Sequence, residues 1–315
     1  MKCSAPRILR HGVVCSMRDP SVFVLGAQKC GTTTVADLLA EQPEVFVPSI
    51  KETYFFCDPA RFELGTDWYR SEFYAVKAFG AAKLLCDATP FYLASSCAID
   101  RLANFNPGSG RYIVCLRDPV DRAYSAYWHQ QRLGNETLDF EQALASESER
   151  VSLARERGQR WWRHAYVEVG MFGSQLRYAF ERLGRENFLI LTSEDLRDIA
   201  EVQIRIRAFL GLPRREGLPS SKRSNASGRP RSRFLQDAVN RPSIAKRFIR
   251  KVVPRELRSS IGRNLLELNL KPFRYPPMNE RTRGELRSRF KSDLYELQAH
   301  GVMVPQSWFS GSQHG

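Results

Sequence analysis

Short apolar runs alternate with amphipathic stretches along this chain. Apolar, β-branched runs bounded by turn or polar residues are typical of buried strands, and they occur at 21–25, 83–86, 111–116 and 187–191. Apolar residues at helical spacing predict helices over 32–42, 120–132, 172–183, 200–210 and 279–298. Strands that alternate with helices form a parallel, twisted sheet. The pattern therefore predicts an α/β fold with a parallel central sheet flanked by helices.

The chain is long enough to bury one large core. Of its 315 residues, 43% are hydrophobic, which is an ordinary share for a globular protein. We expect a single domain over 21–310, with a leader over 1–20 and a tail over 311–315. Residues 213–277 are rich in Pro, Ser and Arg and predict a long loop with short helices. We expect no membrane span, because no apolar run approaches the roughly 20 residues that a span needs, and the leader lacks a signal-peptide core.

Positive charge gathers in one part of the chain. The net charge is +14 at pH 7, and residues 213–258 alone hold fourteen Lys or Arg against three acidic residues. A basic segment binds nucleic acid, a membrane or a small polyanion, or is simply a solvated face. Because this segment lacks regularly interleaved aromatic residues, we do not expect nucleic acid as a partner. The motifs described next favour a small anionic ligand.

The cysteines indicate a reducing compartment. There are seven of them, an odd number, and none forms a C-x-x-C pair. This pattern argues against a disulfide framework and against a zinc site. Several of the cysteines lie in strand-like runs, where a free thiol behaves as a small apolar group. We therefore expect a cytoplasmic protein without a metal.

The turn after the first strand is a candidate anion site. Gly26 and Gly31 stand at the spacing of a P-loop, but the lysine lies inside the loop, as Lys29, and threonines follow the second glycine. These threonines are expected to cap the helix and to add hydroxyl donors to its amides. The loop suits a short anionic group better than a magnesium-bound triphosphate. The alternative is an ordinary strand–helix turn. With this turn, we expect the α/β domain to be of the P-loop type, which has three layers with helices on both faces of the sheet.

A second anion site follows the third predicted strand. That strand delivers Arg117 at its carboxyl end, a proline starts the next helix, and Ser125 falls about two helical turns later. An arginine fork with a hydroxyl suits a phosphate monoester. Parallel strands bind ligands at their carboxyl ends, so both anion sites belong at one edge of the sheet. The alternative is an ion pair of Arg117 with Asp118 or Asp121.

These motifs resemble those of a known superfamily. The phosphate turn, AQKCGTTT, is similar to the 5′-phosphosulfate loop of the sulfotransferases that use 3′-phosphoadenosine 5′-phosphosulfate (PAPS). The runs KETYFFCDP and TDWYRSEF resemble the heparan-sulfate type of that superfamily and its bacterial relatives. The match extends from about Val22 to Trp308. It implies direct, in-line transfer of a sulfuryl group from PAPS to an acceptor hydroxyl or amine, without a metal. The desulfated nucleotide, 3′-phosphoadenosine 5′-phosphate (PAP), is then the product of the donor.

The resemblance also implies roles for individual residues. Glu52 matches the catalytic base of the heparan-type enzymes, and Lys29 would stabilise the leaving phosphate. Sulfuryl transfer needs both a proton acceptor and positive charge at the leaving oxygen. Late in the chain, SNASGRPRSRFLQ resembles the bacterial loop that closes over the 3′-phosphate of the donor. The donor-binding residues implied are Lys29, Cys30, Gly31, Thr32, Thr33, Thr34, Arg117, Ser125, Gly228 and Arg229.

Some positions depart from the family pattern. In CDATP the family lysine is replaced by Ala88, which puts a heparan-like acceptor in doubt, although Asp87 is expected to line the site. Phe172 stands where the family has a tyrosine, and it is expected in the core with Leu176 and Phe180. His129 lies on a helix and is a poor candidate for the base.

Other readings stay open at this point. Glu52 is either the base or the partner of Lys29 or Lys51 in an ion pair. The acceptor is expected to be a carbohydrate, on a glycan or glycolipid, or a small molecule. The first rival function is an ATP-using P-loop kinase, which the missing G-K-S/T disfavours. The second is a non-catalytic protein that binds a polyanion through the basic segment.

Overall fold

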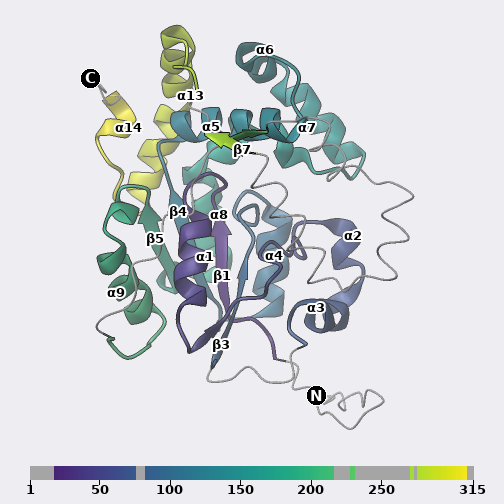
Figure 1. Ribbon diagram of the computed structural model, residues 1–315, viewed down its shortest axis with the longest axis vertical. Helices are drawn as coiled ribbons and strands as arrows, with labels where there is room; N and C mark the ends of the chain where they lie inside the picture. The colour runs from purple at the N-terminus through teal and green to yellow at the C-terminus, as the bar shows by residue number, and fades with distance from the viewer. Residues whose placement is uncertain (1–17, 76–81, 216–227, 231–269, 273–274, 311–315) are drawn as a thin grey trace.

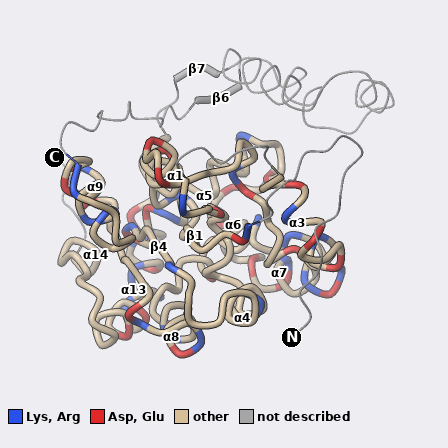
Figure 2. Tube along the Cα trace, turned by 90° about the horizontal axis from the view of Figure 1, so that it is seen from below, with Lys and Arg blue, Asp and Glu red and all other residues tan. Residues whose placement is uncertain are grey.

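The computed structural model describes residues 18–75, 82–215, 228–230, 270–272 and 275–310. The predicted tail, nearly all of the predicted leader and most of the basic loop over 213–277 lie outside the described residues. Within the described part, basic and acidic residues are interspersed along the chain (Figure 2).

Five parallel strands form the central sheet, in the order β2-β3-β1-β4-β5. Figure 1 labels β3, β1, β4 and β5 of this sheet. The strands are β1 (Val22–Gly26), β2 (Val45–Phe46), β3 (Leu84–Ala88), β4 (Arg111–Leu116) and β5 (Phe188–Thr192). The predicted parallel α/β sheet is confirmed. The two-residue strand β2 was not predicted, because so short a segment carries no periodic signal.

Helices cover both faces of this sheet. Helix α1 (Thr32–Ala40) contacts β1, β2 and β3, whereas α4 (Ser96–Phe105) and α8 (Phe172–Leu183) pack against each other. The chain runs from β1 outward to the edge strand β2, returns to β3, and then crosses over β1 to β4. Because such crossovers are right-handed, α4 and α8 lie on the face opposite α1. The result is the predicted three-layer arrangement.

The other long helices complete the core. They are α5 (Pro119–Leu133), α9 (Ile199–Phe209) and α13 (Glu280–Ala299), and α13 contacts both α8 and α5. Their bounds agree with the predicted helices to within one or two residues at each end. The shorter helices are α2 (Pro59–Phe62), α3 (Gly65–Phe73), α6 (Phe140–Ala145), α7 (Glu147–Glu156) and α14 (Ser307–Ser310). Single 3-10 turns occur at η1 (Trp161–Arg163), η2 (Glu168–Gly170), η3 (Arg185–Asn187) and η4 (Asp195–Arg197).

The sheet is the centre of the hydrophobic core. The side chains of β1 and most of those of β3 and β4 are fully buried. Cys86 and Cys115 lie in these strands with no exposed surface, as expected of thiols that pack as small apolar groups. The cysteines of the described part, Cys30, Cys57, Cys86, Cys97 and Cys115, are free thiols. No helix in the described ranges is long and apolar enough to cross a membrane.

Two further strands lie apart from the sheet. The strands β6 (Gly228–Pro230) and β7 (Leu270–Pro272) pair with each other in antiparallel orientation. They contain Gly228 and Arg229 of the predicted donor loop. Only their backbone is described, so the predicted side-chain contacts of Arg229 fall outside the described part and stay a prediction.

Candidate active site

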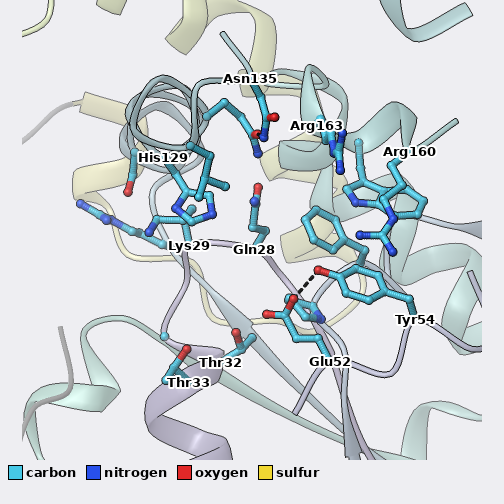
Figure 3. A pocket seen from close by; sticks show the side chains of 18 residues that line it. Gln28, Lys29, Thr32, Thr33, Glu52, Tyr54, His129, Asn135, Arg160 and Arg163 are labelled. Atoms are coloured by element: carbon cyan, nitrogen blue, oxygen red, sulfur yellow. Dashed lines mark hydrogen bonds between the residues drawn. The ribbon is translucent and has the colours of Figure 1, made fainter. Parts of the chain in front are cut away.

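A cavity of about 390 Å³ opens at the carboxyl ends of the parallel strands (Figure 3). Its walls come from the segments that follow β1, β2, β3 and β4, together with α5 and the turn η1. The sequence-predicted residues that line it are Lys29, Gly31, Thr32, Thr33, Glu52, Arg117 and Ser125. The fold thus gathers side chains from three separate stretches of the chain around one space.

The turn after β1 presents the amino end of α1 to this cavity. Gly31 precedes the helix with a φ of 97°, and a Cβ atom there would overlap Cδ1 of Leu196. Only glycine tolerates both the left-handed backbone and the close contact. The first-turn amides of a helix have no partner within it, so they are free to hold an anion. Thr32 and Thr33 line the cavity beside them.

Two features of this turn differ from the prediction. The helix has no side-chain cap, because Gly31 rather than a threonine occupies the cap position. Cys30 and Thr34 are buried and do not line the cavity. The amide of Cys30 donates to the carbonyl of Ala27 at 3.2 Å. Binding of the donor by Cys30 and Thr34 stays a prediction.

Lys29 extends into the cavity from a left-handed backbone, with a φ of 68°. Burial lowers the pKa of its amine to about 8, and the positive charges of Arg132 and Arg117 act in the same direction. A buried amine close to other positive charges is stable in its protonated form only when an anion neutralises the charge. The surroundings of Lys29 therefore fit an anionic ligand.

Arg117 and Ser125 form the second part of the predicted anion site. Arg117 follows β4, and Ser125 lies on α5, whose first turn is capped by Asp118. The ion pair of Arg117 with Asp121 is long, at 4.0 Å, and Asp121 is also paired with Arg283 at 3.0 Å. Arg117 therefore lines the cavity without being tightly held by an acidic partner.

Glu52 lines the same cavity from the segment between β2 and α2. Its Oε2 atom accepts a hydrogen bond from the hydroxyl of Tyr54 (Figure 3). Among the described residues Glu52 forms no ion pair with Lys29 or Lys51, which was the alternative reading of its role. Burial lowers the pKa of Lys51, while the charges of Glu52 and Asp37 oppose that shift.

Asp87 does not line the cavity, contrary to the prediction. It is fully buried behind the wall and accepts hydrogen bonds from four hydroxyls. The donors are Thr53, Tyr69, Thr89 and Tyr92. Burial raises the pKa of Asp87, while these four hydrogen bonds act against the rise. This carboxyl therefore organises the segment that carries Glu52. Its neighbour Ala88, where the family has a lysine, is buried too.

His129 lines the cavity but is not built to accept a proton. Its Nδ1 atom accepts a hydrogen bond from Arg132 at 3.0 Å, since a guanidinium can only donate. Burial lowers the pKa of the imidazole to about 3, as do the charges of Lys29 and Arg132. The ring is therefore neutral, with its proton on Nε2, and acts as a donor.

An aromatic and basic wall faces the anion sites, and sequence reasoning missed it. Tyr54, Phe91 and Trp162 line the cavity with Arg160 and Arg163 (Figure 3). Phe91 and Trp162 pack with ring centroids 5.2 Å apart. Arg160 and Arg163 come from a stretch without periodicity, so no local pattern distinguishes them from surface residues. A weak signal existed on α5, where His129 lies four residues after Ser125 and hence on the same helix face.

The remaining sequence-predicted side chains belong to the core. Phe172 and Leu176 are fully buried in the face of α8 that packs on the sheet, and Phe180 packs partly buried against the same core. No group of three or more His, Cys, Asp or Glu in the described ranges is placed to hold a metal ion.

Comparisons with known proteins agree with this geometry. The family model of the sulfotransferase domain matches residues 19–234, more than half of the chain. The membrane-associated sulfotransferase kil1 of Dictyostelium discoideum is 32% identical over 108 residues, which cover 34% of this chain and 22% of that protein. The bifunctional heparan sulfate N-deacetylase/N-sulfotransferase 2 of Mus musculus is 28% identical over 204 residues, covering 62% and 22% of the two chains. The matches thus span about a fifth of these relatives.

A solved structure shares the fold. The crystal structure of a sulfotransferase from Alicyclobacillus acidocaldarius superposes with a TM-score of 0.65 and 24% sequence identity. The similarity covers 92% of this chain and 99% of that one. It supports the same three-layer arrangement around the parallel sheet.

Proposed function

Because the chain belongs to the sulfotransferase domain family, we propose that it is an enzyme that transfers a sulfuryl group from PAPS to an acceptor hydroxyl or amine. One observation carries the proposal. A single cavity is lined by two separate groups of predicted anion-binding residues and by the Glu52 carboxylate. A nucleotide donor with two phosphate positions and a reaction that releases a proton need such an arrangement.

The donor fits the two groups of predicted anion-binding residues. The amino end of α1, with Thr32 and Thr33, would hold the 5′-phosphosulfate. Arg117 and Ser125 would hold the 3′-phosphate, as a fork and a hydroxyl suited to a monoester. The lowered pKa of Lys29, about 8, supports the same placement. The phosphosulfate would supply the negative charge that neutralises the buried amine and the arginines near it.

The reaction then follows from the positions of three side chains. The acceptor oxygen or nitrogen attacks the sulfur, and the bond from sulfur to the 5′-phosphate oxygen breaks. Lys29 stabilises the electron pair left on that oxygen. Glu52 takes the acceptor proton. His129 is a donor in this arrangement and would bind a sulfuryl or phosphate oxygen through Nε2.

We propose a sugar hydroxyl or amine as the acceptor group. Tyr54, Phe91, Trp162, Arg160 and Arg163 form one wall of the cavity, and Tyr54 is hydrogen-bonded to Glu52. Aromatic rings pack against the apolar faces of sugars and other flat acceptors, and guanidinium groups donate hydrogen bonds to their oxygens. The relative named for heparan sulfate N-sulfotransferase activity supports a glycan, whereas a small molecule would fit the same cavity.

Calorimetric titration with PAP, beside ATP with magnesium, tests the donor. We expect PAP to bind and ATP to bind far more weakly. Arg117→Ala should lower the affinity for PAP by at least about tenfold, because it removes a charge-assisted hydrogen bond. ATP binding without PAP binding would replace the proposal with the kinase alternative. Salt-dependent binding of polyanions without PAP binding would favour the non-catalytic alternative. Transfer of ³⁵S from labelled PAPS to a panel of glycans and small alcohols then identifies the acceptor.

A further inference from the structure

The Glu52 carboxylate is held by one specific donor. The hydroxyl of Tyr54 donates to Oε2, while Oε1 accepts no hydrogen bond from any residue that the structure describes (Figure 3). Burial raises the pKa of the Tyr54 phenol well above its usual value, and the charge of Glu52 and the hydrogen bond to it add to the rise. The phenol therefore stays protonated and donates throughout the neutral range. Tyr54 is not itself a base.

The ring of Tyr54 is fixed on several sides. It stacks on Trp162 at a centroid distance of 5.9 Å with an interplanar angle of 6°, and on Phe91 at 6.0 Å. The guanidinium of Arg160 lies 4.5 Å from the ring centroid on a geometry typical of a cation–π contact. A ring held in this way places its hydroxyl at one point in the cavity wall.

The backbone around Tyr54 is fixed as well. Its φ of 55° is left-handed, which is uncommon for a residue other than glycine and is kept only where the surroundings enforce it. The Oγ1 atom of Thr89 accepts the amides of Thr53 and Tyr54, at 3.1 and 3.4 Å. The hydroxyl of Thr53 is in turn bound to buried Asp87 at 2.7 Å. The carbonyl of Tyr54 accepts the amide of Asp58 at 2.9 Å.

From this geometry we propose that Tyr54 is a positioning residue for Glu52. Its hydroxyl holds Oε2 and leaves Oε1 as the atom that receives the acceptor proton. It also keeps the carboxylate apart from Lys29, on which the charge of Glu52 already acts. An ion pair between Glu52 and Lys29 would neutralise both the base and the cation that stabilises the leaving group. This inference rests on the proposed function, in which Glu52 is the base.

The test compares Tyr54→Phe with Tyr178→Phe, a matched control. Tyr178 also donates to a carboxylate, that of Asp100 at 2.8 Å, but does not line the cavity. Crystal structures of the wild type and both variants with PAP show the Glu52 carboxylate directly. We expect Glu52 to be turned away from its wild-type position in Tyr54→Phe only. An unchanged carboxylate in Tyr54→Phe overturns the proposal, whether or not an acceptor is known.

Kinetics provide the second readout, with PAPS and the acceptor found by the ³⁵S assay. We expect Tyr54→Phe to lower kcat at least about tenfold, with the KM for PAPS nearly unchanged. In Tyr178→Phe both kcat and the KM for PAPS should equal those of the wild type. A kcat in Tyr54→Phe equal to that of Tyr178→Phe counts against the proposal. Failure of the proposed function itself appears separately, as absent PAP binding in the wild type.

Discussion

Lys29 shows how the fold changes the chemistry of a single side chain. As a sequence position it is one lysine in a basic protein, but in the structure burial and two arginines lower its pKa to about 8. The same holds for His129, whose position in the cavity suggests a base until its surroundings make it a neutral donor. The acid–base properties of both side chains are therefore set by burial and by neighbouring charges, some of which, such as Lys29 beside His129, come from distant parts of the sequence.

If Lys29 binds the donor as proposed, its ionisation makes donor binding depend on pH. Only the protonated amine attracts the 5′-phosphate, and its folded-state pKa lies below the ordinary value of 10.5. We expect the affinity for PAP to be nearly constant below about pH 8 and to fall above it by up to about tenfold per pH unit. Calorimetric titrations between pH 7 and 9.5 measure this. In Lys29→Arg, whose guanidinium stays charged, the affinity should not vary with pH; equal slopes in both proteins would exclude Lys29 as the cause.

Removal of the proposed base should separate binding from chemistry. In Glu52→Gln we expect PAP affinity within about twofold of the wild type and turnover reduced at least about 100-fold, the usual contribution of a general base. Glu63→Gln, at an exposed position away from the cavity, is the control and should behave as the wild type. Normal turnover in Glu52→Gln would remove this residue from the mechanism.

At the scale of single elements, the strand–turn–helix unit of β1 and α1 is the part that local rules describe well. The glycine spacing, the buried strand and the amphipathic helix agree with one another. The capping threonines were predicted wrongly, because the turn reaches the helix through a left-handed residue, and only Gly31 adopts that backbone against Leu196. The constraint comes from η4, which is distant in sequence.

Substitution of Gly31 should therefore cost more than its backbone conformation alone. In Gly211→Ala, at a φ of 65° with open space around the added methyl, we expect a loss of about 1–2 kcal/mol in the free energy of unfolding. Gly31→Ala adds the overlap with Leu196, so we expect a larger loss and PAP affinity weakened at least about tenfold. Urea denaturation and calorimetry measure the two effects. Equal losses in both variants would show that the contact with Leu196 is unimportant.

At the scale of the whole molecule, Asp87 connects segments that are separate in the sequence. Its four hydroxyl partners come from the Glu52 segment, from α3 and from the turn after β3. The prediction that it lines the site was wrong. In a sequence, a buried aspartate cannot be distinguished from one that lines a site. The tyrosines that bind the buried Asp87, Tyr69 and Tyr92, stand at no regular spacing from it in the chain.

We expect Asp87→Asn to destabilise the protein by about 1–3 kcal/mol, because the amide cannot accept all four hydroxyl donors inside the core. Asp100→Asn removes a half-exposed carboxylate and should change the free energy of unfolding by less than about 0.5 kcal/mol. Urea denaturation of both variants measures the difference. If the two variants are equally stable, the Asp87 cluster does not hold these segments together.

The sequence by itself determined where the main strands and helices lie along the chain, the parallel sheet, and the two motifs after β1 and β4 that we propose to bind the donor. Each of these depends on residues close together in the chain, where periodicity, turn glycines and strand ends act directly. Only the tertiary structure decided which side chains share the cavity. It withdrew Cys30, Thr34 and Asp87 from the lining and added Tyr54, Trp162, Arg160 and Arg163. The physical reason is that burial, pKa and contact depend on packing between distant segments, which no local pattern encodes.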